Sequence, residues 1–532
     1  MSQDSSLRLL KKWLFVMYDS ENRPDSTGLI TDPTYYNNLT YYDTTAFKSN
    51  SYPLVSSYTN ELLTQTYYDD YSWVSGTGSG LSATMATNYN ANATYFITGY
   101  NTSPTYSQPL TQFVVTRGMT TGTKTKVIGT ASQFLYAASL YDDRGRVIQT
   151  QSVNYTGGID TALVQYSFNG KPLRTLLLQR KSGTNAQSHK ILTKMTYDAG
   201  DRLLAVSKNI DNASADQLIA TNTYNELGQL QTKAIGNSLE SLTYAYNIRG
   251  WLTSINKNFL TAGSTSNYFG MELGYDKSVT APGTTTYLTP QFNGNISGTV
   301  WKSKGDGIDR KYDFSYDDIN RLTSAAFLQN TTGSTWDNSL VDFSVSNLTY
   351  DANGNILSMN QKGFTVGGSA IIDQLTYTYQ TNSNKLSIVN DAANNPISLL
   401  GDFHYSGTKQ AYDYSYDGNG NLILDNNKAI SAITYNYLNL PNQVTVTAKG
   451  TISYTYDAGG NKLLKTTVDN TISPSKTTTT LYLGGTVYQN DTLQFISHEE
   501  GRVRWALHKY TTGTTGYGFE YDYFLLSAMK AV

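Results

Sequence analysis

Short stretches of alternating residue types, each ending in a tyrosine, recur along much of the chain. In Thr243–Asn247, Asp413–Asp417 and Ser453–Asp457, tyrosines alternate with small residues, and each stretch ends in Tyr-Asp or Tyr-Asn. Alternation with a period of two residues is typical of a β-strand that carries one kind of side chain on each face. We therefore predict strands at these positions, each with one face of tyrosine rings.

A turn motif follows these strands: Tyr, then Asp or Asn, two variable residues, Gly, a polar residue and an apolar residue. Asp and Asn cap turns through their side chains, and Gly readily adopts positive φ. The final polar–apolar pair begins the next strand, so one repeat is a β-hairpin that must stack on its neighbours to bury its rings. Eight good copies begin at residues 141, 197, 224, 246, 316, 350, 416 and 456, and degenerate copies begin at residues 18 and 435. The signature residues, for which we expect a structural role, are Tyr141, Asp142, Gly145, Tyr197, Asp198, Tyr224, Asn225, Gly228, Tyr246, Asn247, Gly250, Tyr316, Asp317, Tyr350, Asp351, Gly354, Tyr416, Asp417, Gly420, Tyr456, Asp457 and Gly460.

A calcium role for the repeat turns is the main alternative to this structural one. Asp417, Asn419 and Asn421 are spaced like the opening of an EF-hand loop. That loop needs Gly at its sixth position and Glu at its twelfth, where this chain has Leu422 and Lys428. We therefore expect turn formation rather than metal binding.

Composition narrows the function classes. The 532 residues include 44 Tyr but no Cys and only 4 His, and 39 basic residues nearly balance 41 acidic ones. Tyr-rich composition suits a half-buried sheet surface. The absence of Cys excludes disulfides, thiol nucleophiles and Cys-based metal sites. A near-neutral chain has no overall field to hold a polyanion, so we expect no nucleic-acid partner.

No catalytic constellation stands out. The sequence has neither a Gly-x-Ser-x-Gly elbow nor a His-Glu-x-x-His motif, and the glycine-rich Ser75–Gly80 lacks the Lys-Ser/Thr of a phosphate loop. His498-Glu499-Glu500 is the only His–carboxylate cluster, and we expect it in an exposed turn. We therefore predict a protein that is not an enzyme, with no catalytic, cofactor-binding or metal-ligating residues and no cofactor. Adjacent aspartates, which could act in glycoside hydrolysis but are explained in two cases by turn capping, occur at residues 69–70, 142–143 and 317–318.

The repeated pattern resembles the YD repeat of the RHS family, which includes bacterial RHS proteins, the C components of insecticidal toxin complexes and the teneurins. Recognisable repeats run from Tyr141 to about Lys465, and weaker similarity covers nearly the whole chain. Three further segments resemble the Bacteroidetes branch, namely KKWLFVMYDSENRP (residues 11–24), PQFNGNISGTVWKS (residues 290–303) and HEEGRVRW with YDYF (residues 498–505 and 521–524).

The resemblance implies an all-β architecture in which the stacked hairpins form a long β-sheet strip that spirals into a hollow shell. In that family the shell encloses a C-terminal polypeptide, often a toxin. The expected function is thus a structural shell segment that would carry a toxin or effector. The alternative is a carbohydrate-binding or cell-contact module, because tyrosine rings can stack on sugars. The resemblance also implies secretion or a cell-surface location, although no signal peptide is visible.

The same resemblance suggests how the chain is organised. We expect an N-terminal β segment with a Gly/Ser/Thr-rich loop region (residues 1–130), a YD-repeat shell with an irregular insertion near residues 261–312 (131–466), and C-terminal strands (467–532). Residues 131–140 could be a helix or an extended segment. The Asp-His-Leu-Gly-Asn-Val-Arg core motif of related chains is missing after Tyr521–Phe524, so we expect a piece of a longer shell. Such a piece should self-associate through its unpaired strand edges.

Overall fold

A computed structural model describes most of the chain. The described residues are 13–31, 55–102, 105–261, 266–276, 286–331, 335–394, 402–405, 409–509 and 515–524. Lys11 and Lys12, which open the first family-like segment, and the residues after Phe524, on which the expected truncation rests, lie outside this part.

Almost all of the regular structure is antiparallel β-sheet. Within the described residues the strands form one sheet of 22 strands and one of 11, here called the long and the short sheet. In both sheets each strand pairs with the next one along the chain, so the topology is a continuous meander. In the part of the chain that the structure describes, the helical segments are α1 (Trp73–Gly76), α2 (Lys257–Thr261) and the 3-10 turns η3 (Val55–Ser57) and η4 (Asn426–Lys428).

The strands of the long sheet are β1 (Trp13–Tyr18), β2 (Pro24–Ile30), β3 (Asn60–Asp69), β4 (Thr116–Lys126), β5 (Phe134–Tyr141), β6 (Val147–Val153), β7 (Ile159–Tyr166), β8 (Pro172–Lys181), β9 (Gln187–Tyr197), β10 (Leu203–Ile210), β11 (Gln217–Tyr224), β12 (Leu230–Ile235), β13 (Glu240–Tyr246), β14 (Leu252–Ile255), β15 (Phe269–Gly274), β16 (Gly298–Ser303), β17 (Asp309–Tyr316), β18 (Leu322–Asn330), β19 (Val345–Tyr350), β20 (Ile356–Thr365), β21 (Gly368–Tyr379) and β22 (Leu386–Asp391). Those of the short sheet are β23 (Tyr414–Tyr416), β24 (Leu422–Asp425), β25 (Ile430–Tyr435), β26 (Pro441–Val446), β27 (Gly450–Tyr456), β28 (Lys462–Asp469), β29 (Lys476–Leu483), β30 (Thr486–Gln489), β31 (Thr492–His498), β32 (Gly501–Lys509) and β33 (Thr515–Tyr523).

Each repeat motif forms the turn of one hairpin. Tyr141 pairs with Val147, and Tyr197 pairs with Leu203, so the strand-ending ring faces the apolar residue that starts the next strand. The register shifts just before each of these tyrosines, which is where a β-bulge adds twist to the pair. The predicted all-β fold of stacked hairpins is confirmed.

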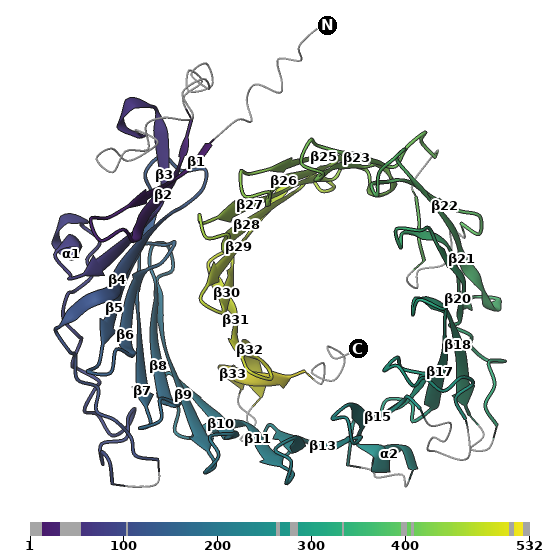
Figure 1. Cartoon of the computed structure of the whole chain (residues 1–532), viewed down its shortest axis with the longest axis horizontal. Helices are drawn as coiled ribbons and strands as arrows, with labels where there is room; N and C mark the ends of the chain where they lie inside the picture. The colour runs from purple at the N-terminus through teal and green to yellow at the C-terminus, as the bar shows by residue number, and fades with distance from the viewer. Residues whose placement is uncertain are drawn as a thin grey trace, which may run out of the picture.

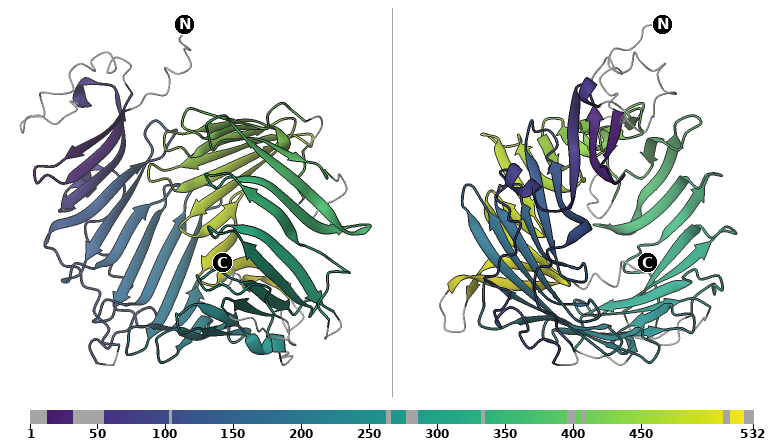
Figure 2. Two further views of the ribbon diagram at one scale, coloured as in Figure 1. Left: turned by 45° about the vertical axis from the view of Figure 1, so that its right-hand side comes forward. Right: turned by 60° about the vertical axis from the view of Figure 1, so that its left-hand side comes forward.

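The strip bends round into a ring in Figure 1, and the short sheet continues inside it. There β29–β33 lie on the inner side of β7–β11, and the tilted views of Figure 2 show the same overlap. Backbone hydrogen bonds join the two sheets where this overlap begins: Ile128 N–H donates to Tyr456 O and Ala458 N–H to Lys126 O, both at 2.8 Å. The wall is therefore two sheets thick over part of the ring.

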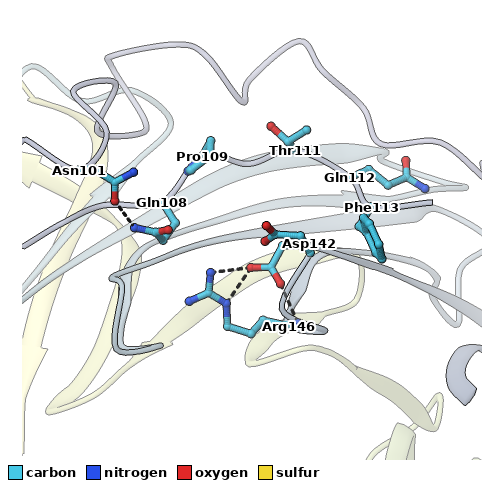
Figure 3. A pocket seen from close by; sticks show the side chains of 9 residues that line it. Asn101, Gln108, Pro109, Thr111, Gln112, Phe113, Asp142 and Arg146 are labelled. Carbon is cyan, nitrogen blue, oxygen red and sulfur yellow. Dashed lines mark hydrogen bonds and ion pairs between the residues drawn. The ribbon is translucent and has the colours of Figure 1, made fainter. Parts of the chain in front are cut away.

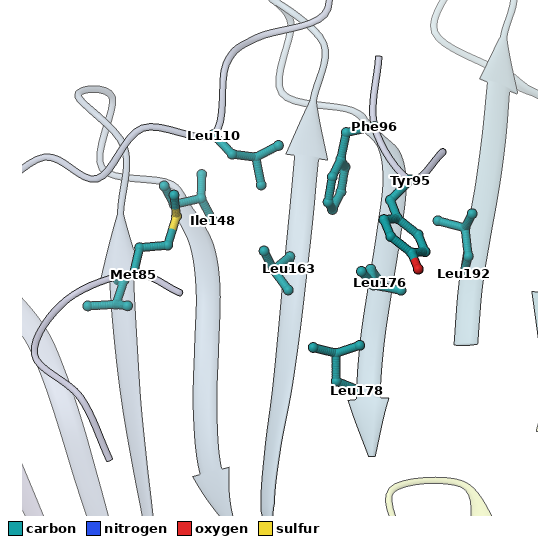
Figure 4. Close-up of a cluster of buried hydrophobic side chains, with 10 residues drawn as sticks. Met85, Tyr95, Phe96, Leu110, Ile148, Leu163, Leu176, Leu178 and Leu192 are labelled. Atoms are coloured by element: carbon teal, nitrogen blue, oxygen red, sulfur yellow. The ribbon is translucent and has the colours of Figure 1, made fainter. Parts of the chain in front are cut away.

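An irregular segment covers the outer face of the long sheet. This strap (residues 77–102 and 105–115) places Met85, Phe96 and Leu110 against buried leucine and isoleucine side chains of β5–β9 (Figure 4). Leu176 on β8 packs under the strap, whereas its neighbour Leu177 packs against the short sheet. Strands buried on both faces need apolar residues at consecutive positions, which explains the unbroken run Leu176–Leu178.

Buried glutamine side chains hold the strap in place. Gln149 and Gln151 on β6 accept from Ala86 N–H (3.1 Å) and Ser82 N–H (2.9 Å). Gln165 on β7 accepts from the Ile97 N–H and donates to the Ile97 carbonyl, at 2.9 and 2.8 Å. These amides satisfy strap backbone groups that have no strand partner, as buried backbone requires.

The structure decides between the two alternatives for residues 131–140 and places strands within the region near 261–312. Residues 134–140 are extended as part of β5, so the helix alternative for residues 131–140 is wrong there; the segment is pinned between β4 and β6. The region near 261–312 holds β15, β16 and the start of β17, which continue the long sheet without a break in pairing.

Candidate functional site

The repeat turn is the most frequent site in the molecule, and Asp142 shows its geometry. The Asp142 carboxylate accepts from the backbone N–H groups of Arg144 (3.0 Å) and Arg146 (2.9 Å), and from the Arg146 guanidinium Nε at 2.7 Å. Gly145 closes the turn at φ 72°, a left-handed conformation that favours glycine. Each signature Asp or Asn is thus committed to its own turn.

A ladder of tyrosine hydroxyls links successive repeats. Tyr224 donates to Leu203 O at 2.9 Å, and Tyr350 donates to Leu322 O at 2.7 Å. In each case the acceptor is the apolar residue that follows the previous turn. The same link is made by Tyr166, Tyr197, Tyr275, Tyr379 and Tyr435, which donate to residues 147, 172, 252, 356 and 422.

Arginine at the sixth repeat position connects neighbouring repeats as well. Arg146, besides pairing with Asp142, lies 4.9 Å from the centre of the Tyr166 ring and donates to Ser167 O at 2.9 Å. Arg321 lies in the same way over Tyr350, at 4.6 Å. A cation over an aromatic face is favourable. Ring, arginine and turn carboxylate therefore form one connected unit.

Sequence reasoning missed repeat copies that the structure makes plain. Tyr166–Pro172 forms the same turn with Ser167 in place of Asp, and the Ser167 hydroxyl accepts from Lys171 N–H at 3.0 Å. Tyr379 begins a longer version in which Gln380 N–H donates to Lys385 O. Allowing Ser at the second position of the motif would have found the first copy, whereas the second also requires a longer turn without the Gly.

Removing a turn carboxylate should destabilise the chain measurably. Asp142 is 4% exposed, so Asp142→Ala leaves two backbone N–H groups and a guanidinium without their acceptor. We expect a loss of about 1–3 kcal/mol in the free energy of unfolding, measured by urea denaturation. Asp142→Asn is the matched control, because Asn225 and Asn247 fill this position in sister turns. Equal losses for both variants would contradict the capping role.

Acid should weaken several turns together. Backbone and side-chain hydrogen bonds from Arg202 and Arg321 hold the pKa values of Asp198 and Asp317 below 3.8. A folded-state pKa below the unfolded value gives stability that is full above the unfolded pKa and is lost as pH falls through the folded one. The urea concentration at half-unfolding should therefore fall as the pH is lowered below about 4. It should fall less steeply in an Asp198→Asn/Asp317→Asn double variant. Parallel pH profiles for the two proteins would contradict this.

The overlap between the sheets is the second site, and its centre is apolar. Ile191 and Ile210 of the long sheet pack with Leu481, Tyr488 and Val503 of the short sheet. Gln179 donates to Leu483 O at 2.7 Å across the same contact. These residues are far apart in sequence, and only the curvature of the strip brings them together.

Ion pairs flank this apolar centre. Lys181 pairs with Asp491 at 2.8 Å, and the lysine side chain is only 1% exposed. Lys208 pairs with Glu499 at 3.0 Å and Lys233 with Glu500 at 2.7 Å. The three lysine side chains are 1–18% exposed, whereas Asp491 and Glu499 are 48% and 43% exposed. Such pairs add little net stability, but removing an acid partner leaves a buried lysine charge uncompensated. The pairs therefore favour one alignment of the two sheets over shifted ones.

The expectation of an exposed turn at His498-Glu499-Glu500 holds for Glu499 but is wrong for His498: Glu499 and Glu500 form the turn between β31 and β32, and Glu499 is exposed, whereas His498 ends β31 and is buried. His498 is 9% exposed, its Nε2 lies 3.0 Å from Asp522 O, and its Nδ1 accepts from Glu500 N–H at 3.2 Å. Burial lowers the pKa of His498, so it is neutral near pH 7. The two glutamates face lysines across the overlap, which the local sequence could not reveal.

A shallow pocket of about 400 Å³ lies between the strap and the turn after β5 (Figure 3). Asn101, Gln108 and Phe113 line its strap side, and Asp142 and Arg146 line its floor. Asp142 and Arg146 are paired with each other, as the dashed lines show, and Gln108 donates to Asn101 at 2.7 Å. Four of the polar side chains that line the pocket are therefore already bonded to one another in pairs.

Sequence reasoning also missed a group of three carboxylates near the end of the long sheet. Asp373, Asp391 and Asp402 each place one oxygen within 4.8 Å of the others. Burial raises the pKa of Asp373, and burial with the neighbouring carboxylates raises that of Asp402 to about 6. The three residues come from separate segments of the chain, so no local spacing of aspartates in the sequence predicts the group.

Comparison with known proteins finds similarity in structure but not in sequence. No family model matches the chain, and no curated protein matches it in sequence. Among solved structures, the crystal structure of TcdB2-TccC3 matches with a TM-score of 0.54 at 12% identity, over 95% of this chain and 21% of that one. The chain has the fold of part of the Tc toxin cocoon shell.

Two further structures of the same shell agree. The Photorhabdus luminescens Tc holotoxin pore matches with a TM-score of 0.54 at 12% identity, over 96% of this chain and 21% of that chain. The TcdB2-TccC3-Cdc42 crystal structure matches with a TM-score of 0.51 at 13% identity, over 97% and 21%. The chain thus spans about a fifth of the length of these cocoon proteins. Among the described residues no helix is long and apolar enough to cross a membrane.

Proposed function

We propose that the chain is a wall segment of a β-shell that encloses a polypeptide, in the way of the cocoon it resembles. The observation that carries this is the position of the last strand. In Figure 1, β33 lies on the inner side of the ring, within the curve of β9 and β10. A chain that continues from this strand would start inside the wall, where a cargo polypeptide would be held.

The side chains support a structural role. The repeat tyrosines donate their hydroxyls to neighbouring backbone, and the turn carboxylates are occupied by their own turns. We propose that the signature residues build the wall and that the rest of the shell comes from partner segments, since the chain spans about a fifth of the matched proteins. Secretion is part of the same proposal. The glycan-binding alternative has less support, because it needs ring faces and hydroxyls that the ladder uses.

Protease protection tests this proposal. One protease-sensitive tag is attached to the N-terminus of the full chain in one protein and to the C-terminus in another. We expect the C-terminal tag to be cleaved several-fold more slowly. The Tyr488→Ala variant, which weakens the overlap, should reduce this difference. Equal cleavage of the two tags in the unaltered chain would overturn the proposal.

A further inference from the structure

The carboxylate group lies where the long sheet ends and the chain crosses to the short sheet. Asp373 is on β21 and Asp391 is the last residue of β22, the neighbouring strand. Asp402 belongs to the described residues 402–405, before β23 begins. Close by, Asp413 N–H donates to Ser387 O at 2.8 Å, so the crossing segment is hydrogen-bonded to β22.

Asp402 is aimed into this group without the partners that a buried carboxylate needs. Its side chain is 0% exposed, and no hydrogen-bond donor from the described residues reaches either oxygen. Its one ion-pair partner among the described residues is the imidazole Nε2 of His404, at 3.4 Å from Oδ2. A buried ionised group without compensation is strongly unfavourable.

The group as a whole carries uncompensated charge. Asp373 and Asp391 are 2% and 5% exposed, and within the described part of the chain neither forms an ion pair with a lysine or arginine. The nearby Lys409 is paired with Asp413 instead, at 2.7 Å. Three carboxylates held together with one imidazole at the edge require protons or a cation.

Backbone donors fix two of the three carboxylates. Asp373 Oδ1 accepts from Phe403 N–H at 2.8 Å. Asp391 Oδ1 accepts from Gln374 N–H at 2.7 Å and Ala393 N–H at 3.0 Å, and Asp391 Oδ2 accepts from Asn394 N–H at 2.5 Å, so Oδ2 is the Asp391 oxygen with a lone pair left for an ion. Hydrogen bonds of this kind orient metal ligands, and a carboxylate oxygen retains lone-pair capacity while it accepts one. The free oxygens of Asp402 complete the set.

We propose that Asp373, Asp391 and Asp402 bind one hard divalent cation, with calcium as the preferred ion. Carboxylate oxygens are the ligands of such ions, and calcium accepts an irregular oxygen set at roughly 2.3–2.6 Å. Two oxygens on one such ion lie at most about 5 Å apart, and the three observed oxygens lie within 4.8 Å of one another. The ion ties residues 402–405 to β21 and β22 and thereby fixes the joint between the sheets.

Calcium binding by the full chain tests the site directly. After dialysis against a chelator, equilibrium dialysis should find one strongly bound calcium per chain, and added calcium should raise the melting temperature (Tm) by several degrees. Magnesium should raise Tm less, because it demands a regular octahedron and keeps its waters. No bound calcium and an unchanged Tm at millimolar calcium would overturn the proposal and favour a proton shared between the carboxyls.

Two variants separate a site from nonspecific binding. Asp402→Asn should abolish the strongly bound calcium and the calcium-dependent rise in Tm, while leaving the calcium-free Tm unchanged or higher, since it removes a buried charge. Asp351→Asn, a half-buried repeat-turn aspartate outside the carboxylate group, is the matched control and should bind calcium like the unaltered chain. Equal calcium binding by all three proteins would overturn the assignment to these residues. The unaltered chain alone decides the question if Asp402→Asn fails to fold.

Discussion

Replacing Tyr488 by alanine should lower the free energy of unfolding by roughly 3–5 kcal/mol, the range for truncating a large buried ring. Tyr488 is 0% exposed and packs at the centre of the overlap between the sheets, 5.9 Å from Lys181 Nζ. Its loss leaves a cavity in the apolar cluster that joins the two layers. Urea unfolding gives the size of the effect, and limited proteolysis should show early cleavage in β29–β33.

Two controls make this result specific to the overlap. Tyr488→Phe keeps the ring and loses only the hydroxyl, which lies 3.4 Å from Gln179 Oε1, so we expect a change below about 1 kcal/mol. Tyr517→Ala removes a ring that is 63% exposed and should change stability by less than about 0.5 kcal/mol. If Tyr488→Ala behaved like Tyr517→Ala, the two sheets would not depend on this contact.

Gly450→Ala should be comparably damaging, at roughly 3–5 kcal/mol, because two costs coincide. Gly450 begins β27 at φ 133°, a conformation that side chains rarely adopt, and a Cβ there would overlap the Val468 carbonyl of β28. The backbone of a paired strand cannot move aside as a flexible side chain could. The same urea measurement gives the loss.

Gly460 separates these two costs. It has φ 85° in the turn between the same two strands, and a Cβ there would meet only Leu440 Cδ1 at 3.7 Å. Gly460→Ala should therefore cost only the backbone strain, about 1–2 kcal/mol. Similar losses for Gly450→Ala and Gly460→Ala would show that the predicted overlap with Val468 is relieved.

The hairpins were predictable because every determinant is local. The alternation before Tyr246, the Asn247 turn and the following Leu252 lie in one short stretch, and that stretch forms β13, its turn and β14. The repeat copy that begins at Tyr166 was missed in the sequence only because Ser167 replaces the expected Asp. A period-two pattern with a turn signal contains enough information to fix such pairs.

The overlap and the strap could not be predicted in this way. Contact between Gln179 and Leu483 depends on the summed curvature of all the strands between them, which no single repeat specifies. In the sequence, the glutamines of β6 and β7 are typical of polar residues on an exposed strand face. Their contacts depend on the strap, which covers them in the folded structure. The group of three carboxylates could not be predicted either, because its residues are brought together by strand pairing and by the segment that crosses between the sheets.

The overlap also limits how this chain can gain or lose repeats. Tandem arrays commonly change length by whole units, since each unit contacts only its neighbours. However, Lys208 on β10 must meet Glu499 in the turn after β31, so a deleted or duplicated hairpin would offset one sheet against the other by two strands. The number of hairpins can therefore change in the part of the chain that precedes the closed ring. Within the closed ring, the circumference fixes the number of repeats.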